Sequence, residues 1–252
     1  MIPPGYREGP AAAITTVSYF SAGVSSAVAT KLAIDQIDRI MYTHIDDQHP
    51  DTMRFVHDCE AWFGKPVEVQ QSPLKSVENA CRMASFIRHP RAGAACTKRL
   101  KRAVRKAFER DMAGCLRVVW GLDADERDRA ERLADSMPDL EHVFPLIERG
   151  ITKADAHKML RAHGIQRPAM YDLGYHNNNC VGCVKGGMGY WNHIRVDFPE
   201  VFAARSKMER DIGFAILGND NWLDELDPER GRHAGPICDD CGIMCELMRS
   251  ET

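Results

Sequence analysis

The chain has 252 residues, of which 44% are hydrophobic and 27% charged, with a formal net charge of -3. This length predicts one large domain, or one domain with a small appendage. The charge balance argues against a chain that is basic throughout, as many nucleic-acid binders are, and no apolar run is long enough to span a membrane. The chain does not begin with a basic segment followed by an apolar one, so we expect a cytoplasmic protein rather than an exported one.

The nine cysteines are unevenly spaced. In a reducing compartment, clustered cysteines bind metal or do redox chemistry more often than they form structural disulfides. Cys180 and Cys183 form a C-x-x-C pair, a spacing at which two thiolates can hold one metal. This pair is compatible with zinc, an iron–sulfur cluster or a redox dithiol. Near the end of the chain lie three more cysteines: Cys238, Cys241 and Cys245.

The hydrophobic pattern predicts strands and helices that alternate along the first half of the chain. In chain order we expect a loose arm (1–13), a strand (15–20), a small-residue loop (21–26), a helix (28–37), a strand (40–45), a helix (55–63) ending at Gly64, a strand (67–70), a basic helix (97–111) and a strand (116–120). Such alternation indicates right-handed βαβ units, and therefore an α/β fold with a doubly wound, mostly parallel, Rossmann-like sheet. In such sheets ligands bind beyond the carboxyl ends of the strands.

The character of the chain changes after residue 176, where glycine, aromatic residues and cysteine become frequent and the periodicity weakens. We therefore expect a nucleotide-type α/β domain over residues 1–176 and a Cys-rich cap and tail over residues 177–252. The two parts are expected to form one folding unit.

The loop between the first strand and the first helix is the first candidate site. A strand that leads through small residues into a helix presents backbone N–H groups and the positive end of the helix dipole, which suits a phosphate. The alternative is a tight turn with no ligand. The loop lacks the Gly-Lys-Ser/Thr ending of a Walker A motif. Its residues are Ser21, Ala22, Gly23, Val24, Ser25 and Ser26.

Three further candidates follow along the chain. Asp46 and Asp47 end the second strand, where they could accept from a ribose, hold a metal or cap a helix. In the basic helix a row of cations shares one side, either as a solvated face or as a site for anions; the row is Lys98, Lys101, Arg102 and Arg105. The charged stretch that follows the fourth strand includes Gly121, Glu126 and Arg129.

Taken in order, these pieces resemble the phosphoadenosine phosphosulfate (PAPS) reductase family, within the adenine nucleotide alpha-hydrolase-like group of PP-loop proteins. The resemblance runs from about Val17 to Cys245. The matching segments are the loop 21–26, residues 46–52, Cys96 with 98–101, residues 121–129, Phe144-Pro145-Leu146-Ile147, Tyr171-Asp172-Leu173-Gly174-Tyr175 with the C-x-x-C pair, and Asp240-Cys241-Gly242-Ile243.

The resemblance implies that the loop, with Asp46, Asp47 and residues of the other motifs, binds an adenine nucleotide: PAPS, its relative without the 3′-phosphate (APS), or ATP. The further nucleotide-binding residues are Lys98, Gly121, Glu126 and Arg129. It also implies that Cys241 attacks the sulfonate sulfur and that a thioredoxin-type thiol then releases sulfite. Some members of the family carry a [4Fe–4S] cluster, and the implied ligands here, with zinc as the alternative metal, are Cys96, Cys180, Cys183 and Cys245.

The sequence departs from the family pattern at four positions. Ala95 leaves one cysteine where the cluster-binding members have two, and Met244 replaces the histidine of the tail. Asp123 stands where an arginine is expected, and Ser25 takes the acidic position of the S-G-G-x-D-S loop found in ATP pyrophosphatases. The stretches 177–180 and 186–191 resemble a subgroup common on phages and mobile elements.

Three functions are compatible with this pattern. The first is a reductase-like enzyme that reduces a sulfonucleotide to sulfite. The second is an ATP-using sulfur transferase that thiolates tRNA or another nucleic acid, bound through the basic helix 97–111. The third is a non-catalytic nucleotide-binding module of a phage or CRISPR-associated system. A homo-oligomer is compatible with each of them, and none needs a membrane.

Overall fold

In the computed structural model, residues 14–89, 93–112 and 114–232 are described. A five-stranded sheet has the order β3-β2-β1-β6-β7, and every neighbouring pair is parallel. This arrangement confirms the predicted α/β fold with a parallel sheet. The strands are β1 (Ile14–Phe20), β2 (Arg39–His44), β3 (Val67–Gln71), β6 (Cys115–Val119) and β7 (Glu141–Val143). A separate two-stranded hairpin is formed by β4 (Arg88–His89) and β5 (Gly93–Ala94).

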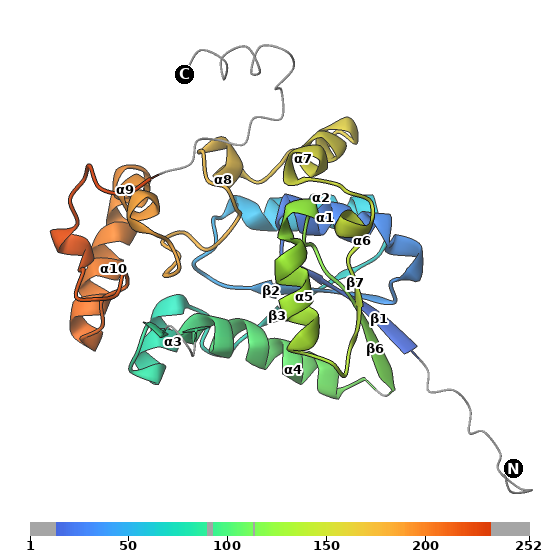
Figure 1. Ribbon diagram of the computed structural model, residues 1–252, viewed down its shortest axis with the longest axis horizontal. Helices are drawn as coiled ribbons and strands as arrows, with labels where there is room; N and C mark the ends of the chain where they lie inside the picture. Colours follow the sequence, from blue (N-terminus) through green and yellow to red (C-terminus); the bar gives the residue numbers. More distant parts are fainter. Residues whose placement is uncertain (1–13, 90–92, 113, 233–252) are drawn as a thin grey trace, which may run out of the picture.

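Helices cover both faces of the sheet because successive side chains of a strand point to opposite sides. Phe20 and Tyr42 pack on one face, against the helices α1 (Val24–Leu32), α2 (Asp51–Phe63) and α7 (Lys153–Ala162). Val17 and Met41 pack on the other face, against Phe108 of α4 (Ala103–Arg110). Figure 1 shows α1, α2 and α7 on one side of the sheet and α3 (Val77–Ala84) and α4 on the other. The remaining helices of this part are α5 (Arg127–Asp135) and α6 (Pro145–Glu148).

Helix boundaries differ in three places from those expected. Helix α2 begins at Asp51 rather than at residue 55. The first helix begins at Val24, earlier than predicted, and is followed by a 3-10 turn at Ile34–Gln36. The predicted basic helix is a π-helical segment, Thr97–Arg102, that continues into α4. The predicted end of α2 at Gly64 is confirmed, because Gly64 has a φ of 68°, the left-handed conformation that closes a helix.

The region after residue 168 is helical, in contrast to the weak periodicity of its sequence. It contains α8 (Ala169–Asp172), α9 (Met188–Asp197), α10 (Pro199–Ile212) and a 3-10 turn at Leu223–Glu225. The apolar residues of α9 do not form one stripe: Trp191 and Ile194 are buried, while Val196 is 78% exposed. A helix without a single apolar stripe has no clear 3.6-residue period, so the sequence does not reveal it.

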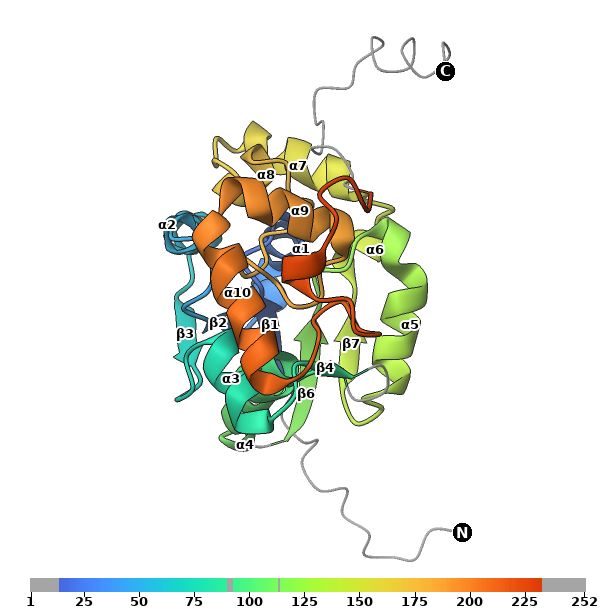
Figure 2. The same cartoon turned by 90° about the vertical axis from the view of Figure 1, so that its left-hand side faces the viewer.

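This helical cap lies at the carboxyl ends of the strands and faces the viewer in Figure 2. It shares a hydrophobic core with α3 and the start of the basic segment, through residues such as Cys81, Leu100, Trp191 and Met208. The Cys-rich part of the cap expected from the sequence includes Cys238, Cys241 and Cys245, which lie outside the described residues. Among the described helices, none is long and apolar enough to cross a membrane.

Candidate functional site

The loop between β1 and α1 is shaped by its own serines. The hydroxyl of Ser26 accepts hydrogen bonds from the Ser21 amide (3.1 Å) and the Ser21 hydroxyl (2.9 Å), and donates to the carbonyl of Gly23 (2.9 Å). Ala22 has a φ of 56° and lies in the left-handed region. Gly23 is the N-cap residue of α1 and provides no side-chain cap. The first turn of α1 therefore keeps backbone N–H groups that an anion can accept from.

The cap closes over this loop through two side chains that the sequence analysis did not include in the site. The Asn178 amide donates to the Ala22 carbonyl (2.8 Å), and the buried Tyr171 hydroxyl accepts from the Val24 amide (3.3 Å). Both residues belong to segments that carry the family resemblance, which is the signal that could have identified them. They fix the position of the loop relative to the cap.

Gly121, a predicted site residue, lies against the loop at the end of β6. A Cβ atom added to Gly121 would lie 2.8 Å from the Ser26 nitrogen and closer still to the Ser26 Cα. Real Cβ atoms essentially never approach backbone so closely, so only glycine allows β6 to pass the loop at this distance. Gly121 therefore sets the spacing between β6 and the loop 21–26, which we call the phosphate loop for its predicted role.

Asp123 also lies at the loop, and its side chain is only 4% exposed. It accepts a hydrogen bond from the Ser25 hydroxyl (3.3 Å) and caps the 3-10 turn Ala124–Glu126. Burial raises the pKa of the Asp123 carboxyl, and the neighbouring Glu126 raises it further, while Lys153 opposes the shift. The loop thus combines N–H donors with a buried carboxylate, which repels a phosphate unless a proton or a cation compensates its charge.

Lys153 is a cation near the loop that the sequence analysis did not select. Its ammonium donates to the His176 carbonyl (2.9 Å) and to the Asn177 side-chain oxygen (2.8 Å). Burial lowers the pKa of Lys153, and the charges of Asp123 and Glu126 partly restore it. Lys153 therefore partly balances the carboxylates beside the loop.

Replacing Asp123 with asparagine should strengthen the binding of a metal-free adenine nucleotide. Two unit charges 4 Å apart interact by about 4 kcal/mol near a protein surface, so removing the carboxylate charge should raise affinity by at least about tenfold. Because the pKa of Asp123 is raised, wild-type affinity should increase as the pH falls through that pKa, and the variant should lose this component. Calorimetric titration with ADP at several pH values checks this. The exposed Asp128→Asn serves as the control, and equal effects of the two substitutions would contradict the expectation.

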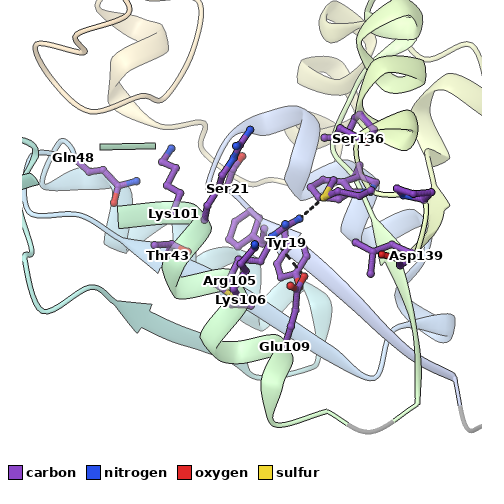
Figure 3. Close-up of a pocket in the computed structure, with 18 residues that line it drawn as sticks. Tyr19, Ser21, Thr43, Gln48, Lys101, Arg105, Lys106, Glu109, Ser136 and Asp139 are labelled. Atoms are coloured by element: carbon purple, nitrogen blue, oxygen red, sulfur yellow. Dashed lines mark hydrogen bonds and ion pairs between the residues drawn. The ribbon is translucent and has the colours of Figure 1, made fainter. Parts of the chain in front are cut away.

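A cavity of about 650 Å³ adjoins the loop and opens between α4 and the end of α5 (Figure 3). The side chains of Tyr19, Met41 and Trp120 come from the sheet, and Ser21 belongs both to the cavity and to the loop. Its cationic residues come from the basic segment: Lys101, Arg102, Arg105 and Lys106. Its size and apolar lining suit a small ligand such as a nucleoside.

The Tyr19 side chain is fixed inside this cavity. Its hydroxyl donates to Glu109 (2.6 Å), and its ring lies 5.6 Å from that of Trp120, centroid to centroid. Burial, reinforced by Glu109, raises the pKa of Tyr19, so the hydroxyl stays protonated and remains a donor. The cavity thus has a rigid aromatic wall beside the phosphate loop.

The structure places Asp46 and Asp47 in different roles. Asp47 accepts from the Val77 amide (2.6 Å) and forms an ion pair with Arg205 of α10, so it joins α3 to the cap. Asp46 is exposed and accepts from the Gln71 side chain (2.6 Å). Neither residue lines the cavity described above. Asp47 thus contacts the first residue of α3, and not the start of α2, the helix that follows it in the chain. A ribose or metal contact for either residue stays a prediction.

The other predicted nucleotide-binding residues lie near the site but at its margin. Lys98 is exposed and does not line the cavity, whereas Lys101, three residues further on, does. Glu126 completes the capping box with Asp123 and forms an ion pair with Arg129. The Arg129 side chain is 66% exposed. A nucleotide contact for Lys98, Glu126 or Arg129 stays a prediction.

The thiols of Cys96, Cys180 and Cys183, which are predicted metal ligands, are neighbours in the structure. Burial raises the pKa of Cys180 to about 12, with contributions from Cys183 and Cys96, while Lys101 lowers it. Burial also raises the pKa of Cys96, with a contribution from Cys183. The Cys180 segment is held against β2, because the Val181 amide donates to the Asp47 carbonyl (2.8 Å). Two segments distant in sequence thus bring their three thiols together.

These thiols do not by themselves fit an iron–sulfur or zinc site. Within the described residues, no three His, Cys, Asp or Glu side chains are placed to hold a metal ion. The raised pKa values of Cys96 and Cys180 also favour the thiol over the thiolate that a metal requires. The predicted fourth ligand Cys245 and the predicted nucleophile Cys241 lie outside the described residues.

Comparison with known proteins identifies the family of the chain. The family model of the phosphoadenosine phosphosulfate reductase domain matches residues 15–186, which include the phosphate loop, Gly121, Asp123 and the C-x-x-C pair. A search of curated protein sequences finds none that matches the chain. Because the match covers more than half of the sequence and the parallel sheet agrees with it, the chain belongs to the phosphoadenosine phosphosulfate reductase family, whose members bind nucleotides and carry out sulfur chemistry.

Proposed function

We propose that the chain is an enzyme that binds an adenylated sulfonucleotide and reduces its sulfonate group to sulfite. The main observation in support of this proposal is that the phosphate loop and the cavity meet at Ser21, which belongs to both. A nucleoside in the cavity would place its 5′-phosphate at the N-terminus of α1. There the backbone N–H groups and the helix dipole stabilise negative charge.

In the proposed reaction Cys241 is the nucleophile. Its thiolate attacks the sulfonate sulfur, the bond from that sulfur to the phosphate oxygen breaks, and the nucleoside phosphate leaves. The product on the protein is an S-sulfocysteine. One thiol of a thioredoxin-type protein then attacks the Cys241 sulfur and expels sulfite, and its second thiol resolves the mixed disulfide. The partner dithiol is oxidised by two electrons, which are the electrons that reduce the sulfonate sulfur.

The position where the tail begins supports this role for Cys241. The Asn192 side chain donates to the carbonyls of Asp227 (2.9 Å) and Arg230 (2.8 Å). A Cβ atom on Gly231 would lie 2.8 Å from the Met188 carbonyl carbon, so the chain is held tightly against the start of α9. Ten Cα–Cα steps separate Gly231 from Cys241, and an extended chain of that length can span at most about 36 Å. The tail therefore starts from the cap that contacts the phosphate loop.

The test is sulfite release. Full-length protein is incubated anaerobically with PAPS or with APS, with thioredoxin as the dithiol, and sulfite is measured. We expect sulfite and the nucleoside phosphate in equal amounts, and consumption of one dithiol per turnover. Tight nucleotide binding without any sulfite from either substrate would contradict the proposed reaction and favour a non-catalytic module.

The iron–sulfur cluster implied by the family resemblance is a separate proposal. The neighbouring thiols of Cys96, Cys180 and Cys183 support it only if the tail supplies a further ligand such as Cys245, since no three ligating side chains of the described residues are placed to hold a metal. When bound, a cluster would supply redox-active iron. Protein purified anaerobically is expected to contain iron and acid-labile sulfide. Stoichiometric zinc without sulfide would contradict this expectation.

A second function is favoured by Asp123. A carboxylate beside the phosphate loop suits a nucleotide that arrives with Mg²⁺, because Mg²⁺ is commonly bound by one or two carboxylates together with substrate phosphates. This supports an ATP-using sulfur transferase as the alternative. Release of AMP and pyrophosphate from Mg²⁺–ATP, dependent on an added RNA or DNA, would favour the transferase over the reductase. Sulfite release without ATP would favour the reductase.

A further inference from the structure

The basic segment formed by Thr97–Arg102 and α4 carries a row of positive charge. It contains seven lysine and arginine side chains against one carboxylate, Glu109, in a chain whose formal net charge is -3. We call this set the α4 cation row, and its members are Lys98, Arg99, Lys101, Arg102, Arg105, Lys106 and Arg110.

Most of this charge is not compensated within the protein. Within the described residues, Arg105 forms an ion pair with Glu109 (3.5 Å), and no other member of the row has a carboxylate partner. Arginines elsewhere behave differently, as Arg39, Arg54 and Arg210 each bind a carboxylate. The row is therefore a concentration of free positive charge that can attract an external anion.

The row runs past the mouth of the cavity. Lys101, Arg102, Arg105 and Lys106 line the cavity, and Figure 3 shows Lys101 toward Ser21 and Gln48, with Arg105 and Lys106 further along beside Tyr19. Lys101, Arg102 and Lys106 are exposed, so their charged groups are accessible from solvent. From Lys98 to Arg110 the helical segment is about 18 Å long. This length matches several successive phosphates rather than the phosphate of one mononucleotide.

The surface lacks the features of a protein-binding patch. The cores of protein interfaces are depleted of charged residues and enriched in aromatic anchors. The large exposed hydrophobic residues of the described chain lie on other elements: Ile14, Val69, Met83, Leu173 and Val196. Of these, Met83 contacts Arg99 at one end of the row (3.5 Å from its sulfur to the Arg99 nitrogen), and a single apolar side chain does not form such a patch. Unpaired cations beside an aromatic-walled cavity are instead the combination that binds single-stranded nucleic acids.

We propose that the α4 cation row binds the phosphate backbone of a single-stranded nucleic acid. The cavity, about 650 Å³, can admit an unstacked base at its mouth but not a duplex. This inference rests on the proposed function in one respect only, which is that the inner end of the cavity at Ser21 belongs to the adenine nucleotide. A strand along the row passes directly beside that nucleotide.

The test is fluorescence anisotropy with full-length protein and labelled RNA and DNA strands of 20 nucleotides, over a salt series. The double substitution Arg102→Gln with Lys106→Gln is expected to weaken binding at least tenfold at low salt. It should also reduce the slope of log affinity against log salt by about 1.4, since each phosphate contact of a single strand contributes about 0.7. The control is Lys158→Gln with Lys207→Gln, which removes the same charge from α7 and α10 and should leave both values unchanged.

Three results would overturn the inference. The first is the absence of RNA and DNA binding at low salt, and the second is an equal loss of affinity in the two double variants. The third is that polyaspartate of equal charge displaces the labelled strand as effectively as unlabelled nucleic acid does. An acidic protein would then bind the α4 cation row as well as a nucleic acid does. A separate titration with PAPS, APS and ATP shows which proposal has failed. If one of these nucleotides binds, the nucleotide site stands and only the nucleic-acid inference fails; if none binds, the proposed function fails.

Discussion

Replacing Gly121 with alanine is expected to weaken adenine nucleotide binding by about 100-fold, because a displacement of about 1 Å at a positioned site has effects of this size. The added Cβ would collide with the backbone of Ser26, so either β6 or the phosphate loop must move. Overpacking of this kind also lowers the free energy of unfolding by about 1–3 kcal/mol. Calorimetric titration with APS measures the first effect, and thermal unfolding measures the second.

The matched control for this substitution is Gly187→Ala. A Cβ atom at Gly187 meets nothing within 4 Å, and its backbone is extended, so alanine fits there without strain. We expect the control to bind nucleotide as the wild type does. If Gly121→Ala binds APS with wild-type affinity and also unfolds at the wild-type temperature, the loop does not hold the phosphate in the way proposed here.

Substituting Cys241 with serine is expected to abolish sulfite release while leaving nucleotide affinity unchanged. A serine hydroxyl is a far weaker nucleophile than a thiolate and cannot form the S-sulfocysteine. Mass spectrometry of the wild type, mixed with PAPS or APS in the absence of a dithiol, should show one added sulfonate on Cys241. The variant should show none.

The neighbouring Cys238→Ser provides the comparison, since Cys238 lies outside the tail motif that resembles the family. We expect this variant to retain sulfite release. Loss of activity in Cys238→Ser together with normal turnover in Cys241→Ser would identify Cys238, and not Cys241, as the nucleophile. Normal turnover in both variants would exclude Cys238 and Cys241 as the attacking group and leave Cys245 as the tail thiol to be tested.

Four strands of the sheet could be predicted from the sequence because each is a short run rich in apolar residues followed by a turn. The fifth, β7, was not predicted, because two of its three residues, Glu141 and His142, are polar. The phosphate loop was also predictable, since small residues between a strand and a helix are local signals. The helices of the cap were not, because α9 buries Trp191 and Ile194 but leaves Val196 exposed, which removes the helical period. The start of α1 was missed because Val24, Ser25 and Ser26 are all buried, so the helix begins without an amphipathic pattern.

The site could be predicted only where its residues lie together in one short segment of the sequence. Ser25 and Asp123 are 98 residues apart in sequence, and Tyr19 and Glu109 are 90 apart, so neither contact follows from a local pattern. Local spacing also does not distinguish Lys98 from Lys101, and only the packing of α4 on the sheet decides which of them lines the cavity. Asp47 was selected as a ligand-binding carboxylate, but its partner Arg205 lies 158 residues further along the chain.

The central claim is that the phosphate loop and the adjoining cavity form one nucleotide site, and hydrogen exchange tests it most directly. Backbone amides are compared in the wild-type protein with and without saturating APS, and again with Mg²⁺–ATP. We predict slower exchange in two regions that are distant in sequence, residues 21–26 and residues 136–140 at the far side of the cavity. Slower exchange confined to other segments, or no change with either nucleotide, would contradict the claim.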